Sequence, residues 1–269
     1  MGVRETAAAC ETVNVTVGDR HDHVATVELS RPDARNALDR TLRSELKEVL
    51  DAVADSDLRV VVLTGDPEAG AFVAGADVTE LRERDALDQR EASKRPRVYE
   101  YVDDLPLPVI ARINGHALGG GCELVQACDV RIAHERAKLG QPEINLGIMP
   151  GGGGTQRLPR LVGEGQAMRL VLSGEPIDAA EARDIGLVEA VCDEDTFDDR
   201  VYDLAASMAE KSPVALEFAK EAIKGASRMD LEAGIEYEAE LFAQLFGTAD
   251  KNEGIDAFFE DRDPEWAGR

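Results

Sequence analysis

The stretch from Ile113 to Leu158 constrains this chain most, because it sets two glutamates among glycines and apolar residues. Glu123 follows three consecutive glycines and a cysteine, and an apolar helical stripe begins at the next residue. Glu143 leads into a second apolar run, which ends in four glycines at positions 151–154. A carboxylate in apolar surroundings needs a partner or a function. The stretch therefore predicts two buried acids next to glycine-rich turns.

Such a pair of acids is suited to proton transfer. Two carboxylates in one dry pocket cannot both ionise easily, so one pKa is expected to rise and the pair to titrate as a unit near neutral pH. Glycines let the main chain approach a ligand, and Gly120, at the start of a helix, can donate its N–H to a developing oxyanion. The simpler interpretation is a glycine turn whose glutamate only contacts the helix dipole.

A third segment, residues 71–81, offers a similar main-chain donor. Its apolar extended run breaks at Ala74, Gly75 and Ala76, and Asp77 then begins a helix in the manner of an N-cap residue. The N–H of Ala76 is therefore a second candidate oxyanion donor, also at a strand-to-helix junction.

Four segments together resemble a known family. AFVAGADV, NGHALGGGCEL, LGQPEINLG and PGGGGTQRL match, in order and separation, segments of the crotonase superfamily and specifically of its enoyl-CoA hydratases. The similarity runs from about Val13 to the C-terminus and includes RPDARNAL, residues 31–38, where the family binds coenzyme A. It implies an α/β fold, a crotonase-like spiral of ββα units with a C-terminal helical region. Residues 12–195 would form the spiral core with the CoA and catalytic sites, and residues 196–269 a helical oligomerisation region.

The resemblance also implies a reaction, the reversible addition of water to a trans-2-enoyl-CoA to give a 3-hydroxyacyl-CoA. Glu123 is expected to activate the water and Glu143 to deliver a proton to Cα, while the N–H groups of Ala76 and Gly120 hold the thioester oxygen. Gly151 resembles the position whose backbone helps to place the water. The residues expected to bind substrate are Arg35, Ala37, Ala74, Gly75, Asp77, Val78, Gly121, Pro142 and Gly151.

One departure from the family pattern concerns the CoA phosphates. Many members have lysines on either side of the first oxyanion segment, whereas this chain has Gly70 and Thr79 at those places. The phosphates are then expected to meet Arg35, another subunit or backbone groups. No separate cofactor is expected, because CoA is part of the substrate. The alternatives within the family are an enoyl-CoA isomerase or a short-chain 3-hydroxyacyl-CoA dehydratase of another pathway; the presence of both acids favours hydration.

The charge of the chain excludes several partners. It has 54 acidic and 30 basic residues, a formal net charge of −24, and seven of the basic residues are lysines. Such a surface repels nucleic acid and anionic membranes, so an RNA-binding role is not expected. Acid-rich, lysine-poor surfaces resemble those of extreme halophiles, in which concentrated salt screens the self-repulsion. The alternative is an acidic protein adapted to ordinary salt.

Other features favour a cytoplasmic enzyme without a metal. There is no apolar run long enough to span a membrane, and the N-terminal residues lack the apolar core of a signal peptide. The four cysteines have no CxxC spacing, which favours reduced thiols, and the four histidines form no ligand pattern.

Patterning along the chain predicts most of the elements. Residues 1–11 are expected to form a loose tail. Strands are predicted at 13–17, 24–29, 60–63, 109–113, 130–133 and 187–191. Helices are predicted at 40–54, capped by Asp39, and at 179–184, 197–209, 213–224, 231–246 and 252–260, with an exposed helical excursion at 77–102. The family packs its C-terminal helices across subunits, in trimers that pair into hexamers, so a homo-oligomer is expected.

Overall fold

The computed structural model describes residues 2–269, in which the chain alternates between two β-sheets. The larger sheet has the order β1-β2-β3-β5-β7-β10 and the smaller has the order β4-β6-β8-β9. The strands of the larger sheet are β1 (Val13–Val17), β2 (Val24–Leu29), β3 (Val60–Gly65), β5 (Val109–Ile113), β7 (Val130–His134) and β10 (Ala190–Cys192). Those of the smaller sheet are β4 (Ala71–Val73), β6 (His116–Leu118), β8 (Lys138–Gly140) and β9 (Ile177–Asp178).

Successive turns of the chain add one strand to each sheet, in the order β3 then β4, β5 then β6, and β7 then β8. Their neighbours within each sheet pair in parallel, whereas β1 with β2 and β8 with β9 pair antiparallel. All six residues of β3 are buried, as expected of a parallel strand covered on both faces. This repetition stacks the turns into a spiral.

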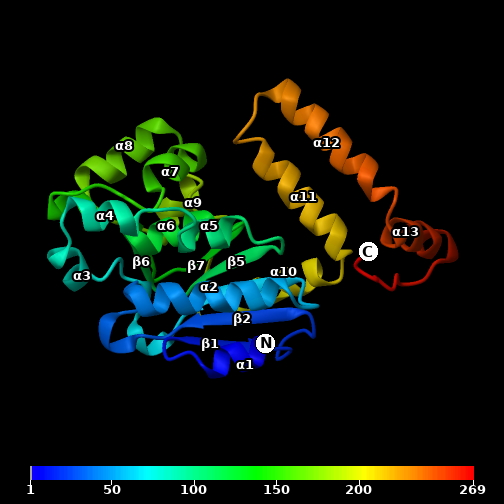
Figure 1. The fold of residues 1–269 in the computed structure, drawn as a ribbon, viewed down its shortest axis with the longest axis horizontal. Coiled ribbons are helices and arrows are strands. Elements are labelled where there is room, and N and C mark those ends of the chain that lie inside the picture. Colours follow the sequence, from blue (N-terminus) through cyan, green and yellow to red (C-terminus); the bar gives the residue numbers. More distant parts are fainter. Residues whose placement is uncertain (1) are drawn as a thin grey trace.

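Helices cover both faces of the larger sheet (Figure 1). On one face lies α2 (Arg40–Ala54), which begins where the Asp39 carboxylate accepts the N–H of Leu42 and which buries an apolar stripe that includes Leu46. On the other face lies α10 (Phe197–Ala209), which packs with Val60 and Val62 in a separate apolar cluster. The side chains of β3 alternate between these two clusters, so one strand supports both layers.

The remaining helices lie around the two sheets or follow the spiral. The α-helices are α1 (Val3–Ala8), α3 (Val78–Glu83), α4 (Ala86–Ala92), α5 (Val98–Asp103), α6 (Gly120–Ala127), α7 (Gly154–Val162), α8 (Glu164–Ser173), α9 (Ala179–Asp184), α11 (Pro213–Gly225), α12 (Leu231–Leu245) and α13 (Ala249–Glu260). Three 3-10 helices are η1 (Pro32–Ala34), η2 (Pro67–Ala69) and η3 (Pro142–Leu146). Within residues 2–269, no helix combines the length and the apolarity needed to cross a membrane.

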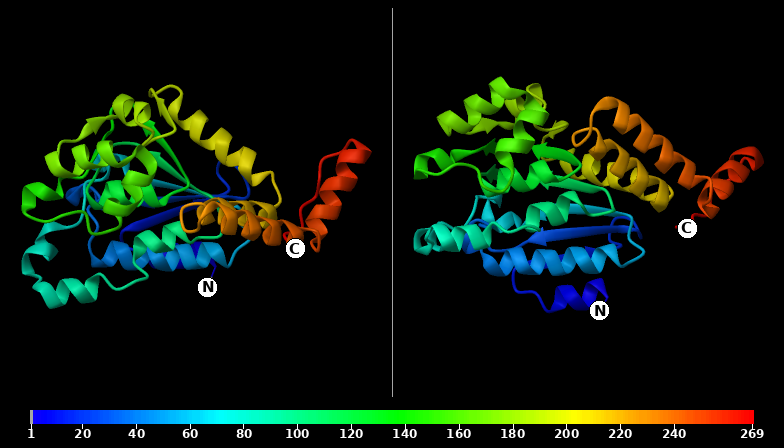
Figure 2. Two further views of the ribbon diagram at one scale, coloured as in Figure 1. Left: turned by 90° about the horizontal axis from the view of Figure 1, so that it is seen from above. Right: turned by 45° about the horizontal axis from the view of Figure 1, so that its top comes forward.

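The last helices project from the core (Figures 1 and 2). Helix α11 is tied to the core by Lys224, which pairs with Asp103 and Asp129. Beyond it, α12 and α13 extend to one side and carry large apolar side chains that are 46% exposed or more. These side chains are Leu231, Ile235, Phe242, Phe246, Ile255, Phe258 and Phe259.

Three predictions about elements need correction. Residues 3–8 are helical instead of forming a loose tail, because Val3 and Thr6 are buried against the core. The excursion at 77–102 is exposed through α3 and α4, but α5 is buried because its apolar residues pack beneath α6. The last strand begins at Ala190, since Leu187 and Val188 are buried in the turn that precedes it.

Candidate active site

Glu123 lies in the first turn of α6 and is 3% exposed. Its Oε1 accepts two main-chain N–H groups, from Gly152 at 2.6 Å and from Gly154 at 2.8 Å. Burial raises the pKa of this carboxyl, and the two N–H groups act in the opposite sense by stabilising the anion. The glycine loop that precedes α7 is therefore the partner that a buried acid at this position requires.

Two arginines hold the same loop through its carbonyl groups. Arg97, just before α5, donates to the Gly151 carbonyl, and Arg157 of α7 donates to the Gly152 carbonyl at 3.1 Å. Arg97 also pairs with Glu100 at 2.7 Å. The loop thus presents its N–H groups to Glu123 and its carbonyl groups to guanidinium groups, which fixes its orientation.

Glu143 lies in η3, opposite the turn that starts α6. A Cβ built on Gly119 would be 3.1 Å from its Oε1, so the carboxylate touches that turn. With its amide oriented so that its oxygen accepts Nε2 of Gln126 at 2.9 Å, Gln141 donates to both oxygens of Glu143 at 3.0 and 3.1 Å. Burial and then the charge of Glu123 raise the pKa of Glu143 to about 7. The structure thus brings the two acids close enough for the charge of Glu123 to affect the titration of Glu143.

The two predicted oxyanion donors also converge. A Cβ built on Gly120 would lie 3.4 Å from the main-chain N of Ala76. Leu38 holds the Ala76 segment by forming a parallel bridge with it, in which the Leu38 N–H donates to the Gly75 carbonyl at 2.8 Å. Neither the Ala76 nor the Gly120 N–H has an acceptor in the part of the chain that the structure describes. Both groups are therefore available to a ligand oxygen.

Tyr99 is a site residue that the sequence did not reveal. It is 9% exposed on α5, and its hydroxyl would be 3.0 Å from a Cβ on Gly120. Burial, followed by the charge of Glu123, raises the pKa of Tyr99, so the phenol stays protonated. The apolar residues Val98 and Val102 beside it were the available signal of a buried turn within a polar segment.

The residues predicted to bind substrate lie in three places. Arg35 and Ala74 line a cavity of 260 Å³ together with His116 and Leu118, and burial, Lys138 and Arg35 lower the pKa of His116. Other members lie along or beside the Ala76 segment; these are Ala37, Gly75, Asp77 and the exposed Val78. The last three lie around the acids: Gly121 is buried against β4, Pro142 begins η3, and Gly151 opens the glycine loop.

The part of the chain that the structure describes contains no evident metal site. No group of three or more His, Cys, Asp or Glu side chains among residues 2–269 is arranged to hold a metal ion. All four cysteines are free, and two of them, Cys122 and Cys128, are buried on α6.

Comparison with known proteins decides the family. The sequence model described as "Enoyl-CoA hydratase/isomerase" matches residues 19–269. The chain belongs to this family. Among its enoyl-CoA hydratase/isomerase relatives, the 2,3-dehydroadipyl-CoA hydratase of Escherichia coli is 45% identical over 93% of this chain and 97% of that protein. The short-chain-enoyl-CoA hydratase of Clostridium acetobutylicum is 39% identical over 93% of this chain and 96% of that protein.

Solved structures of the family agree with the fold. The enoyl-CoA hydratase from Bacillus anthracis superposes with a TM-score of 0.90 at 41% identity, covering 96% of this chain and 100% of that one. The predicted crotonase-like α/β fold is confirmed. The expected enzyme class, a hydro-lyase of the enoyl-CoA hydratase type, agrees with the names of these relatives.

The packing of the glycine loop gives a first prediction. A Cβ on Gly152 would clash with the Tyr99 ring and lie 2.6 Å from Oε2 of Glu123, whereas nothing lies within 4 Å of a Cβ on Gly151. Gly152→Ala is expected to lower the free energy of unfolding by about 1–3 kcal/mol through overpacking. Gly151→Ala is the matched control and should stay close to wild type in denaturant titrations. Equal stabilities of the two variants would contradict this packing.

The raised pKa of Glu143 predicts a pH-dependent stability. Its folded pKa of about 7 lies above the ordinary value of 4.5, so its contribution to stability is complete below pH 4.5 and is lost as pH rises through about 7. Glu143→Gln cannot ionise, so its Tm is expected to exceed that of wild type above pH 7 but not below pH 4.5. Glu48→Gln, at an exposed site on α2, is the control. A Tm difference for Glu143→Gln that does not vary with pH would reject the shift.

Proposed function

We propose that this protein catalyses the reversible hydration of trans-2-enoyl-CoA thioesters to 3-hydroxyacyl-CoA. The observation that carries the proposal is the meeting of two acids with raised pKa values, the buried Glu123 and the half-buried Glu143, with two unengaged main-chain N–H groups, those of Ala76 and Gly120. An enoyl thioester needs both kinds of group, donors for its carbonyl oxygen and acids for the two protons that move. The family membership and the names of the relatives support the same reaction.

In the proposed reaction, the thioester oxygen accepts the N–H groups of Ala76 and Gly120. Their donation stabilises the enolate-like charge that develops as water adds at Cβ. Glu123, whose carboxylate form the two N–H groups of the glycine loop stabilise, takes a proton from that water. Glu143, whose pKa of about 7 keeps much of it protonated at neutral pH, delivers a proton to Cα. In the reverse reaction the two glutamates exchange their acid and base roles, and the 3-hydroxyacyl-CoA loses water.

The CoA part of the substrate is proposed to enter by the cavity that Arg35 and Ala74 line. Arg35 supplies a cation there in place of the lysines that are absent at Gly70 and Thr79. The reaction needs no cofactor beyond the CoA that the substrate carries. The four free cysteines favour a reducing compartment, in keeping with a cytoplasmic enzyme.

The acyl group is not decided by the relatives. One is named for 2,3-dehydroadipyl-CoA, one for short-chain enoyl-CoA and one, from Syntrophomonas wolfei, for crotonyl-CoA. Isomerisation of enoyl double bonds remains the alternative activity within the family. The engagement of both acids at one site favours hydration, which needs one acid at each carbon.

Replacing either acid tests the proposed roles. Glu123→Gln and Glu143→Gln are each expected to lower kcat for crotonyl-CoA hydration by at least about 100-fold, because each removes a proton-transfer group. The assay follows loss of the conjugated thioester absorbance, and Glu48→Gln is the control. In wild type, kcat for hydration should fall as pH rises through about 7, where Glu143 loses its proton. Near-normal hydration by Glu143→Gln would reject this assignment.

The C-terminal helices are proposed to assemble subunits. Phe258 and Phe259 of α13 and Leu231 of α12 are each at least 80% exposed, which leaves apolar faces that a second copy of the chain would cover. Light scattering in concentrated KCl is expected to give the mass of a trimer or hexamer. The Phe258→Ser/Phe259→Ser variant should dissociate toward smaller species. A wild-type mass of one subunit would reject the assembly.

The net charge of −24 is proposed to reflect adaptation to high salt. The Debye length is about 30 Å at 0.01 M salt and about 3 Å at 1 M, so carboxylate repulsion is largely screened only in concentrated salt. The Tm is therefore expected to rise steadily between dilute buffer and molar KCl. Greater stability in dilute buffer would contradict the proposal.

A further inference from the structure

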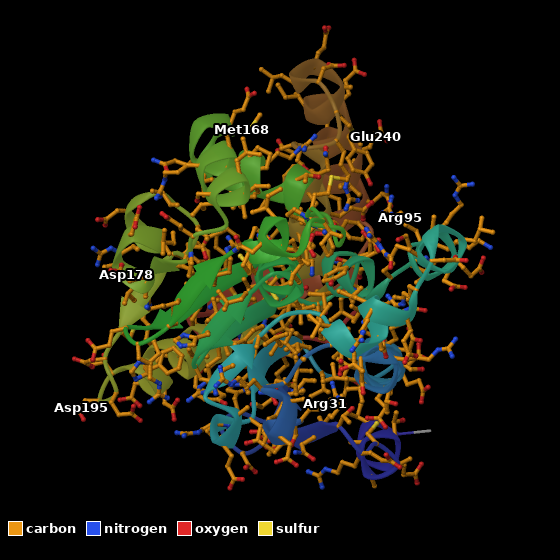
Figure 3. The ribbon with its side chains drawn as sticks, turned by 90° about the vertical axis from the view of Figure 1, so that its left-hand side faces the viewer. Arg31, Arg95, Met168, Asp178, Asp195 and Glu240 are labelled. Carbon is orange, nitrogen blue, oxygen red and sulfur yellow. The ribbon has the colours of Figure 1, made fainter. Side chains whose placement is uncertain are left out.

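A second cavity, of 730 Å³, lies between the first half of α2, the helices α3 and α4, and residues 94–98. Six cationic side chains line it, against four carboxylates, in a chain whose net charge is −24. The cations are Arg40, Arg43, Lys47, Arg84, Lys94 and Arg97. In Figure 3 the label of Arg95, the residue after Lys94, shows on which side of the molecule this cavity lies. Asp178 and Asp195 are on the opposite side of that view. A local surplus of positive charge on so acidic a protein indicates a site for an anion.

Lys94 pairs with Glu91 at 2.6 Å and Arg97 with Glu100 at 2.7 Å, but two of the six lining cations, Arg40 and Lys47, have no carboxylate partner among residues 2–269. Glu80 is shared by Arg43 at 2.6 Å and Arg84 at 2.7 Å, so one carboxylate serves two guanidinium groups. Lys47 donates to a neutral acceptor, the Pro96 carbonyl, at 3.1 Å. The Arg40 guanidinium has no hydrogen bond or ion pair to any of residues 2–269, although its main-chain N–H donates to Glu80.

The inner wall of this cavity adjoins the proposed reaction centre. Arg43 donates to the Leu38 carbonyl at 2.6 Å, and Leu38 is the residue that bridges Ala76. Arg97 lies over the Tyr99 ring, 5.7 Å from its centroid, and the Tyr99 hydroxyl faces Gly120. Arg43 and Arg97 therefore contribute both to the wall of the cationic cavity and to the contacts around the Ala76 and Gly120 N–H groups.

The two cavities suit the two arms of a thioester. Along the segment that contains Ala76, Ala74 lines the smaller cavity and Glu80 lines the larger one. With the carbonyl at Ala76 and the CoA arm directed toward Arg35, the acyl arm is directed toward the larger cavity. An acyl chain that ended in a methyl group would leave Arg40 and Lys47 without a carboxylate partner, whereas a terminal carboxylate would give them one.

We propose that the acyl group of the substrate ends in a carboxylate, so that the enzyme acts on CoA monothioesters of unsaturated dicarboxylic acids, with Arg40 and Lys47 binding the distal carboxylate. The inference rests on the proposed hydration of enoyl-CoA and names the class of acyl group. Hydrogen bonds to charged groups contribute enough to give roughly 10- to 100-fold in affinity. The selectivity is therefore large enough to measure.

The experiment compares matched substrates. The CoA monothioester of trans-2-hexenedioic acid is assayed beside trans-2-hexenoyl-CoA, and the eight-carbon pair likewise, in about 1 M KCl, where contacting charges are less screened than distant ones. Wild type is expected to prefer the dicarboxylic member of at least one pair by about 10-fold or more in kcat/KM. The Arg40→Gln/Lys47→Gln variant should lose that preference mainly through KM and keep its rate on the neutral member. Arg90→Gln, which removes an α4 arginine that does not line the cavity, should behave as wild type.

Binding without turnover separates this inference from the proposed reaction. Calorimetry with the CoA monothioester of hexanedioic acid and with hexanoyl-CoA should show the same preference and the same loss in the double variant. Equal binding of the two, or tighter binding of hexanoyl-CoA, overturns the inference while leaving hydration of neutral substrates intact. An equal loss of both ligands in the double variant also overturns it, since the cavity would then bind a CoA phosphate. Failure to hydrate any enoyl-CoA, with the binding preference present, would instead reject the proposed reaction.

Discussion

The two hydrogen bonds from Gly152 and Gly154 to the Glu123 carboxylate are the interaction on which the site depends. A carboxylate that is 3% exposed requires such donors, because its desolvation is otherwise too costly. The loop that supplies them turns its carbonyl groups outward, where Arg97 and Arg157 meet them. The contacts therefore run from the Glu123 carboxylate to the N–H groups of the loop, and from the carbonyl groups of the loop to the guanidinium groups of Arg97 and Arg157.

The same series of contacts reaches the C-terminal helices. Arg157 approaches Asp103 at 3.5 Å, and Asp103 also pairs with Lys224 near the end of α11 and with Arg228 just beyond that helix. Burial alone would raise the pKa of Asp103, but these cations lower it by more. Asp103 therefore remains an anion between the loop and α11. The division of the chain at residue 195 that the sequence suggested stays a prediction, but these ion pairs cross it. A change in the position of α11 would consequently shift Asp103 and Arg157, and through them the glycine loop.

How far the sequence could predict the site depends on how local each signal is. Glu123, Glu143, Ala76 and Gly120 lie in short motifs, and the structure brings them together; their chemical roles remain proposals. Arg97 contacts a carbonyl 54 positions away, so no local pattern could indicate it. Tyr99 was hidden for a related reason, since it lies at the end of a long polar segment and is buried by α6. The spiral itself followed from resemblance, because strand periodicity alone indicated only an α/β fold.

The four glycines at 151–154 look interchangeable in the sequence, but the structure makes them unequal. The space beside Gly152 is filled by the Tyr99 ring and Glu123, whereas the space beside Gly151 is open. Residue 151 is therefore the place at which an enzyme engineer could introduce side chains of graded size into open space, one residue away from the glycine whose N–H holds Glu123.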